Sequence, residues 1–159
     1  PERGAIRVSD DPAGKAQAVL GERPVLVTPA QLLLAYSAVA TRGTIYQLRR
    51  ASQSTKPPAV LRRVRLKSST WMTIEEGLEE CVHSGTGYAA AVPGVRVAGK
   101  TGTAGAPDGS GVTHAWFVGY APVDSPRVAL VVFLERGTGG RDAAPLAGRI
   151  LRHYFEGSQ

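Results

Sequence analysis

Three β-prone segments follow one another in the second half of the chain, and the connections between them are short. The segments are 95–103, 115–121 and 128–135, and only the Gly-rich residues 105–111 and the Pro-containing residues 122–126 separate them. Neither connection has room for a crossover helix, so neighbouring strands have to run antiparallel. The sequence therefore predicts an antiparallel sheet in this part of the chain.

Helical patterns lie on both sides of these strands. Thr28, Pro29 and Gln31 predict an N-cap, a first helical position and a capping box for a helix that Gly43 ends. Apolar residues surround most of this helix, so we expect it to be largely buried. Two further helices are predicted over 70–83 and 143–155. The faces that we expect them to bury consist of Trp71, Ile74, Leu78, Cys81 and Val82 in the former and of Leu146, Ile150, Leu151 and Tyr154 in the latter.

The fold class that these patterns predict is α+β, an antiparallel sheet flanked by helices. The 159 residues are enough for one sizeable core. We interpret 1–24 as a connecting segment with a short helical turn at 13–20, and 25–156 as part of one folded domain. Between the first two helices, β-prone pieces at 45–48 and 60–66 flank a polar stretch, 52–58, that we expect to be an exposed loop.

The net charge of +6 would suit several kinds of partner, among them nucleic acid and an anionic membrane surface. The densest basic stretch is only 62–67, which alternates polar with apolar residues like an edge strand, and no aromatic residues are interleaved with the basic ones. We therefore interpret the charge as scattered over the surface and expect no nucleic-acid partner.

Cys81 is the sole cysteine, which excludes an intrachain disulfide. Together with His83, His114 or His153 it would suit a thiol enzyme, but its place on the apolar face of a predicted helix favours a core position. His114 precedes a strand and either borders a site or is simply exposed. The three histidines lack the paired spacing of a metal site, and we expect neither a metal nor a cofactor.

Residues 94–101 match the phosphate-loop pattern G-x-x-x-x-G-K-[ST], which offers a first interpretation of Lys100. Such a loop needs a helix that begins at the Lys-Thr pair, so that the helix N-terminus and backbone amides surround the phosphates. Here 95–98 alternates like a strand, and Gly102, Gly105 and Pro107 follow where the helix has to begin. Nucleotide binding is therefore the less favoured alternative.

The second interpretation places Lys100, Thr101, Gly102 and Thr103 in a strand at the mouth of an acyl-transfer site. The ammonium group of Lys100 attracts a substrate carboxylate, and the hydroxyls of Thr101 and Thr103, which share a face of the strand, can donate hydrogen bonds to it. Gly102 has no Cβ, so a peptide-like substrate can lie against the backbone there. The plain structural alternative is a glycine-containing strand with an exposed lysine.

Several separated segments, in the same order along the chain, resemble the transpeptidase domain of penicillin-binding proteins. Segments 25–32 and 35–43 resemble the family's Thr-Pro-Leu-Gln helix with its Ala-Asn-x-Gly end, 85–90 its Gly-Thr-Ala loop, 97–104 its substrate strand and 115–122 the neighbouring strand. Together they cover residues 25–135. The resemblance implies part of the family's serine β-lactamase-like fold, with 25–156 as the C-terminal portion of a transpeptidase domain.

The resemblance also implies an activity. A serine attacks the D-Ala-D-Ala stem of peptidoglycan, forms an acyl-enzyme and passes the acyl group to an amine or to water, and β-lactams trap the same serine. Lys100 would then supply positive charge, Thr101 and Thr103 would hold the terminal carboxylate, and the backbone N–H of Thr103 would belong to the oxyanion hole.

The partners that the resemblance implies are peptidoglycan stem peptides, β-lactams, the upstream part of the same polypeptide and cell-wall synthesis proteins. The implied location is extracytoplasmic, in the periplasm or on the outer face of the bacterial membrane. The anchor would lie in a segment outside this chain.

The sequence departs from the family where the nucleophile is concerned. The residues three positions before the four lysines are Pro12, Gln53, Val64 and Val97, so the family's Ser-x-x-Lys motif is absent. The Ser-x-Asn motif is absent too, because the chain has no asparagine, and residues 9–11 are a faint substitute better interpreted as a solvated turn. We expect the serine on an upstream segment and this chain alone to be inactive. A non-catalytic relative that recognises β-lactams or muropeptides is the alternative.

Overall fold

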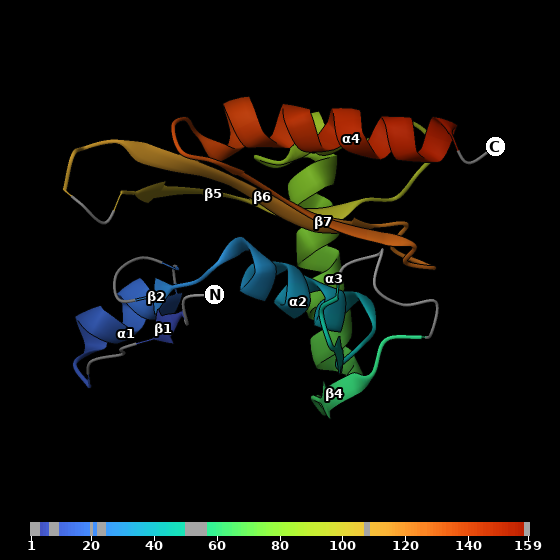
Figure 1. The fold of residues 1–159 in the computed structure, drawn as a ribbon, viewed down its shortest axis with the longest axis horizontal. Coiled ribbons are helices and arrows are strands. Elements are labelled where there is room, and N and C mark those ends of the chain that lie inside the picture. Colours follow the sequence, from blue (N-terminus) through green and yellow to red (C-terminus); the bar gives the residue numbers. More distant parts are fainter. Residues whose placement is uncertain are drawn as a thin grey trace.

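The computed structural model describes residues 4–6, 10–19, 21, 25–49, 57–106 and 109–157. Figure 1 shows a sheet with the C-terminal helix above it and other helices below it and behind it. Residues 52–56 of the predicted loop 52–58 lie outside the described residues. Ser9, Pro107 and Asp108 lie outside them too. In chain order the elements are β1 (Ala5–Ile6), α1 (Pro12–Val19), β2 (Val25–Leu26), α2 (Pro29–Ala40), β3 (Thr44–Tyr46), β4 (Val60–Arg63), α3 (Ser68–His83), the 3-10 turn η2 (Tyr88–Ala90), β5 (Ala98–Gly105), β6 (Thr113–Ala121), β7 (Val128–Leu134), the π-helical turn η3 (Gly139–Ala143) and α4 (Ala144–Glu156).

The main sheet has the order β5, β6, β7, and both neighbouring pairs are antiparallel. The predicted pairing of 95–103 with 115–121 is confirmed, with Thr101 opposite Phe117 and Thr103 opposite Ala115. The short connections between strands thus predicted the antiparallel sheet correctly, and the predicted α+β fold class is confirmed.

The first strand of this sheet begins at Ala98 and not at Val95. Val95 bridges back to Val92 around Gly94, whose φ of 74° lies in the left-handed region that glycine adopts without strain. The predicted strand therefore begins three residues too early, and the observed strand continues two residues farther than predicted, to Gly105.

α4 packs on the upper face of the sheet (Figure 1), and the main core lies between them. Leu151 is fully buried as predicted and Leu146 packs against the core, but Ile150 and Tyr154 are 45% and 36% exposed. The prediction is wrong for these two residues because they lie beside the face of α4 that is turned to the core, and that face includes small residues. A Cβ at Gly148 would overlap the backbone of η2, so the close approach of this helix requires glycine there. The buried residues of α4 are Ala144, Ala147, Gly148 and Leu151.

α2 lies below the sheet (Figure 1), against β6 and β7. Its predicted capping box is confirmed: the N–H of Gln31 donates to Thr28 Oγ1 at 3.2 Å, and the N–H of Thr28 donates to Gln31 Oε1 at 2.9 Å. The helix is less buried than predicted, since within α2 Ala38 is buried and the other apolar residues, Leu32, Leu33, Leu34, Tyr36, Val39 and Ala40, are half-buried. A helix that forms an outer layer buries only the face that it turns to the sheet.

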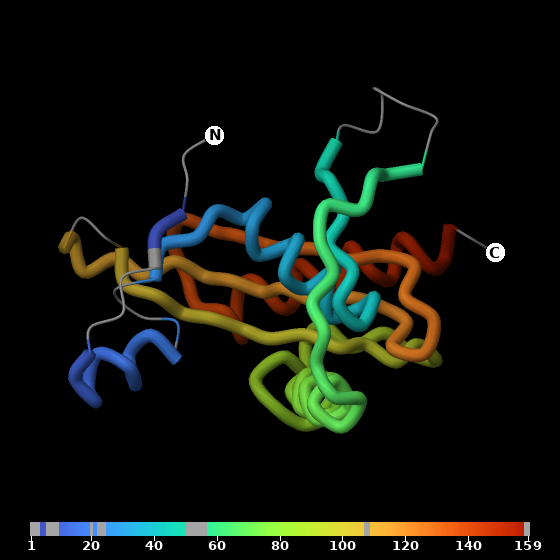
Figure 2. The backbone as a smooth tube through the Cα atoms, turned by 90° about the horizontal axis from the view of Figure 1, so that it is seen from below, coloured from blue at the N-terminus to red at the C-terminus, as the bar shows by residue number. Residues whose placement is uncertain are grey.

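α3 runs across the edge of the sheet beside β5, where Figure 2 shows it end-on. Of the face predicted to pack, Trp71 and Val82 are buried, and Ile74, Leu78 and Cys81 are half-buried. The helix begins at Ser68, two residues before its predicted start, and ends at His83 as predicted.

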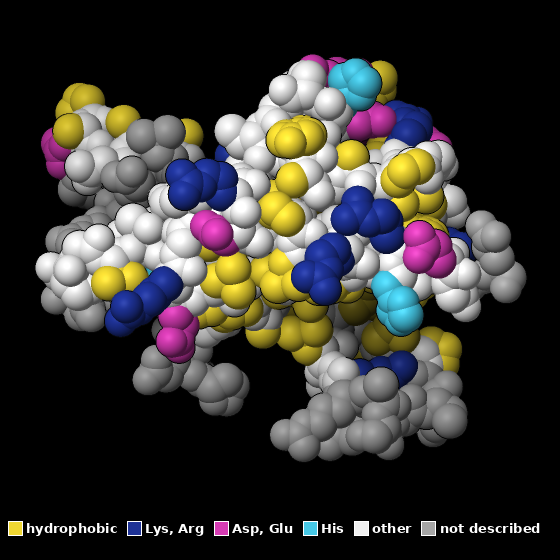
Figure 3. Space-filling model, turned by 90° about the horizontal axis from the view of Figure 1, so that it is seen from above, with side chains coloured by type: hydrophobic (Ala, Val, Ile, Leu, Met, Phe, Trp, Pro, Cys, Tyr) yellow, Lys and Arg dark blue, Asp and Glu magenta, His cyan; other side chains and the backbone are white. Residues whose placement is uncertain are grey.

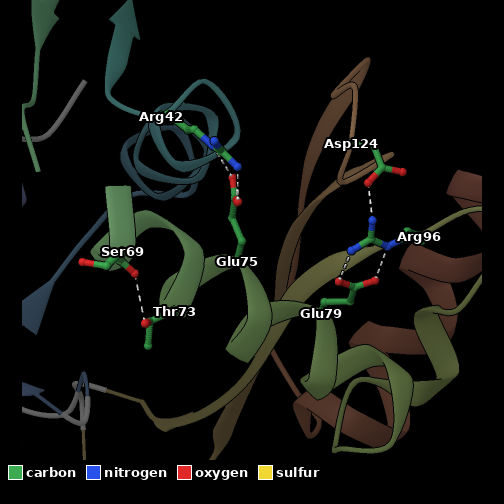
Figure 4. A network of polar contacts seen from close by, with 7 residues as sticks. All are labelled: Arg42, Ser69, Thr73, Glu75, Glu79, Arg96 and Asp124. Carbon is green, nitrogen blue, oxygen red and sulfur yellow. Dashed lines mark hydrogen bonds and ion pairs between the residues drawn. The ribbon is translucent and has the colours of Figure 1, made fainter. Parts of the chain in front are cut away.

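Two arginines connect α3 to its neighbours (Figure 4). Arg42, just after α2, forms an ion pair with Glu75 at 2.8 Å. Arg96, just before β5, donates to both carboxylate oxygens of Glu79 at 2.6 Å and also contacts Asp124 in the β6–β7 connection. The hydrogen bonds from Arg96 hold the pKa of Glu79 below its ordinary value.

Replacement of Arg96 by glutamine is expected to lower the midpoint of thermal unfolding at neutral pH and to change it little in acid. The folded-state pKa of Glu79 lies below its ordinary value of 4.5, so the pair stabilises the fold above that pH and stops doing so as the pH falls through the folded-state pKa. Thermal unfolding at about pH 7 and about pH 3 measures the effect. Arg149→Gln, on the exposed side of α4, is the control. An equal Arg96→Gln effect at both pH values would contradict the prediction.

Two small antiparallel pairs lie outside the main sheet, β1 with β2 and β3 with β4. The β-prone pieces predicted at 45–48 and 60–66 correspond to β3 and β4, and every residue of β4 is exposed. The helical turn predicted at 13–20 corresponds to α1, which buries no residue. The division of the chain into 1–24 and 25–156 stays a prediction.

Figure 3 shows the molecule from above, on the α4 side, with basic side chains spread over that face and acidic side chains among them. This distribution agrees with the interpretation of the net charge as scattered surface charge. None of the helices in the described ranges has both the length and the apolar character needed to cross a bilayer.

Candidate active site

All four predicted site residues, Lys100 to Thr103, lie in β5, at one edge of the main sheet. No described strand pairs with the outer side of β5, and α3 crosses that side near the start of the strand (Figure 2). The chain stays extended from Ala98 to Gly105, so no helix begins at Lys100. The phosphate-loop interpretation is therefore wrong, because the helix N-terminus that would hold a phosphate is missing.

The site residues alternate between the two faces of β5. Thr101 shares the α4 face with its neighbour Phe117 in β6, and Thr103 shares it with Ala115, so the two threonines do lie on one face. Lys100 is on the opposite face and exposed, and its Nζ donates a hydrogen bond to the carbonyl oxygen of Thr101 at 2.8 Å. At an edge strand both faces adjoin the same open side, so the ammonium group and both hydroxyls can approach one ligand there.

The hydroxyl of Thr101 has a partner in the chain that sequence reasoning missed. Thr101 is only 9% exposed, and its Oγ1 lies 2.5 Å from Oγ1 of Thr86. Thr86 comes from the turn that follows α3, the segment that resembles the family's Gly-Thr-Ala loop. The resemblance marked the position, but no local pattern indicated which strand residue it would contact.

The hydroxyl of Thr103 is held in a comparable way from another element. The backbone N–H of Gly139, at the start of η3, donates to Thr103 Oγ1 at 3.0 Å. A Cβ at Gly139 would lie 2.6 Å from the carbonyl oxygen of Gly102, so only glycine can approach β5 this closely. The Gly-Gly pair before the last helix was the available sequence signal, and it was missed.

The start of η3 is held by the carboxylate of Asp142. The N–H of Thr138 donates to a carboxylate oxygen of Asp142 at 2.7 Å, and this hydrogen bond holds the pKa of Asp142 below its ordinary value. The carboxylate thus stays ionised and fixes the turn that brings Gly139 to Thr103.

The weaker candidates from the sequence lie beside the site or in packing positions. His114 lies in β6, with Nδ1 2.8 Å from the carbonyl oxygen of Glu135 and its ring edge-on to Phe133. Cys81 is half-buried at the end of α3, and its Sγ lies 3.7 Å from Oγ1 of Thr86.

A hollow of about 560 Å³ lies elsewhere, between the end of α2, α3 and the β6–β7 connection, at the ion pairs of Figure 4. Its two arginines, Arg42 and Arg96, are already paired with acids, and residues 100–103 do not line it. We therefore place the candidate site at the open side of β5.

Comparison with known proteins shows the family to which the chain is similar. The model of the penicillin binding protein transpeptidase domain matches residues 10–152. Among curated proteins, the chain is 34% identical to stage V sporulation protein D of Bacillus subtilis, over 89% of this chain and 24% of that protein. It is 30% identical to the peptidoglycan D,D-transpeptidase MrdA of Acinetobacter baumannii, over 86% of this chain and 23% of that protein.

Among solved structures, penicillin-binding protein A from Mycobacterium tuberculosis, as its imipenem acyl-enzyme complex, superposes with a TM-score of 0.76 at 25% identity. The match covers 97% of this chain and 37% of that one. The chain belongs to the penicillin-binding protein transpeptidase family. It spans about a quarter of the length of the curated relatives it matches.

Proposed function

We propose that this chain supplies the substrate-binding strand of a peptidoglycan D,D-transpeptidase, with Lys100, Thr101, Gly102 and Thr103 as its site residues. One observation carries the proposal: this Lys-Thr-Gly-Thr sequence occupies an edge strand, with Lys100 and Thr103 exposed, in a chain of the transpeptidase family. The substrate is the D-Ala-D-Ala end of a peptidoglycan stem peptide, and β-lactams compete for the same site.

Each site residue has a chemical task in the acyl-transfer reaction. Lys100 brings positive charge to the anionic end of the substrate, and Thr101 and Thr103 donate hydrogen bonds to its terminal carboxylate. The backbone N–H of Thr103 donates to the oxyanion that forms when the serine attacks, and it needs a second donor, the backbone N–H of the nucleophile itself. That serine belongs to a part of the protein beyond this sequence, since no Ser-x-x-Lys occurs here.

The same reasoning sets the partners and the location that we propose. The upstream part of the polypeptide completes the site, and other cell-wall synthesis proteins act with it. Peptidoglycan lies outside the cytoplasmic membrane, so the protein works in the periplasm or on the outer face of the membrane, held by an anchor outside this chain.

Penicillin labelling tests the proposal. The isolated 159-residue chain is expected to form no covalent adduct, and the full-length protein with its Ser-x-x-Lys segment is expected to form one adduct per molecule. Covalent trapping requires a serine with a nearby base, and no serine of this chain has a lysine three positions after it. Mass spectrometry after incubation with excess penicillin gives the stoichiometry.

The matched control is the full-length protein with its Ser-x-x-Lys serine changed to alanine, which is expected to stay unlabelled. A stoichiometric adduct on the isolated chain would contradict the placement of the nucleophile. A full-length protein that binds penicillin without acylation would favour the non-catalytic alternative.

A further inference from the structure

The contact between Thr86 and Thr101 connects the turn after α3 to the substrate strand. The two Oγ1 atoms are 2.5 Å apart, at the face of β5 toward α4, and 15 residues separate them along the chain. The distance is short for two hydroxyls, and Thr101 is 9% exposed whereas Thr86 is exposed. Thr86 thus contacts the side chain that is proposed to bind the carboxylate.

The turn that carries Thr86 is fixed from two sides. On the α3 side, the N–H of Gly87 donates to the carbonyl oxygen of Cys81 at 2.9 Å, and a Cβ at Gly85 would lie 2.9 Å from the same oxygen. On the η3 side, a Cβ at Gly140 would lie 2.9 Å from the carbonyl oxygen of Thr86. Three glycines thus allow backbones to approach this turn closely, and the position of the Thr86 hydroxyl follows from that packing.

Substrate binding decides the direction of the hydrogen bond between the two hydroxyls. A carboxylate only accepts hydrogen bonds, so the Thr101 hydroxyl has to donate its single hydrogen bond to the carboxylate. The proton between the two oxygens must then come from Thr86, which donates to Thr101. Thr86 in turn has a lone pair directed away from this bond, and the thiol of Cys81, with Sγ 3.7 Å from Thr86 Oγ1, is a weak donor that can fill it.

A hydroxyl that accepts one hydrogen bond donates another more strongly. Thr103 shows the same arrangement, because its Oγ1 accepts from the backbone N–H of Gly139 at 3.0 Å and keeps its proton for a ligand. Both threonines of the site are thus supplied with a donor from within the chain, one by a backbone amide and the other by a side chain.

We infer that Thr86 is a positioning residue that orients the Thr101 hydroxyl as a donor and so sets the preference of the site for ligands with a free carboxylate. The inference rests on the proposed function. Since Thr86 acts only when a carboxylate is present, its removal weakens recognition of carboxylate ligands and spares neutral ones. That selectivity distinguishes a positioning role from a merely structural one.

The test uses the full-length transpeptidase and two probes, benzylpenicillin and its methyl ester. Thr86→Val is expected to lower the second-order acylation rate constant for benzylpenicillin by about 10-fold and to change that for the ester less than about 2-fold. Thr86→Ser, which keeps the hydroxyl, is expected to stay near the wild type with both probes. Thr73→Val, on α3 with its hydroxyl bonded to the carbonyl oxygen of Ser69, is the matched control away from the site.

A double-mutant cycle gives an independent readout. In a Thr101→Val background, Thr86→Val is expected to have no further effect on benzylpenicillin, since the hydroxyl that it orients is gone. Two outcomes would overturn the inference, provided that the wild type is acylated. One is that Thr86→Val lowers the acylation rate constants for benzylpenicillin and for the ester equally; the other is that the effects of the two substitutions are additive. A wild type that is not acylated at all would overturn the proposed function, and the inference with it. Thermal unfolding of each variant shows that the comparison is made on folded protein.

Discussion

Replacement of Lys100 by alanine in the full-length transpeptidase is expected to slow acylation by penicillin by about 100-fold or more. The lysine is exposed at the open side of β5, and its ammonium group lies 2.8 Å from the backbone carbonyl oxygen of Thr101. Its removal takes away the only full positive charge of the Lys-Thr-Gly-Thr strand, and an electrostatic contribution of this kind acts on both substrate binding and the transition state. Stopped-flow measurement with a chromogenic cephalosporin resolves the acylation rate constant from the dissociation constant.

Two further variants test whether the effect is specific to the charge at Lys100. Lys67→Ala removes an exposed lysine at the start of α3, where the side chain makes no capping hydrogen bond, and acylation is expected to stay at the wild-type rate. Lys100→Arg keeps the charge and is expected to recover part of the loss, since a guanidinium does not match the position of an ammonium group. Wild-type acylation by Lys100→Ala would refute the role proposed for this residue. The midpoint of thermal unfolding of Lys100→Ala is expected to equal that of the wild type, because an exposed lysine contributes little packing.

The features that sequence reasoning predicted are those encoded by neighbouring residues. Thr28 and Gln31 are three positions apart and form the capping box by themselves, so the start of α2 follows from local chemistry. Short connections require antiparallel neighbours, and once two strands are antiparallel the alternation of Lys100 and Thr101 assigns them to opposite faces. The substrate strand could therefore be placed before its surroundings were known.

The features that were missed depend on how closely backbones approach one another. Gly139 and Thr103 are 36 residues apart, and their hydrogen bond exists because η3 can lie against Gly102 without a Cβ. The buried face of α4 was misjudged for a related reason: the helix approaches its neighbours closely at Gly148, and Ile150, about 200° around the helix from Gly148, stays at the surface. Apolar periodicity identifies a helix, but it does not show whether small or bulky residues face the core.

Replacement of Phe117 by alanine is expected to destabilise the domain by about 3–5 kcal/mol. Phe117 is 0% exposed, and its ring covers Gly99 and Gly119, where an added Cβ would meet ring atoms. Glycines cannot fill the space that the ring leaves, and the strands around it are held in a sheet, so most of the cavity would remain. Urea unfolding of the full-length protein, followed by tryptophan fluorescence, measures the loss.

The size of the replacement side chain decides whether the cavity is the cause. Phe117→Leu leaves a smaller space and is expected to cost less than half as much as Phe117→Ala, whereas Tyr88→Ala, at a residue that is 69% exposed, is expected to stay within about 0.5 kcal/mol of the wild type. Phe117 also lies opposite Thr101, so the substrate strand loses its support on the α4 face when the ring is removed. The rate at which penicillin acylates the folded fraction should then fall with stability, less for Phe117→Leu and more for Phe117→Ala. Equal unfolding free energies for Phe117→Ala and Tyr88→Ala would show that this ring is not part of the core that holds β5 in place.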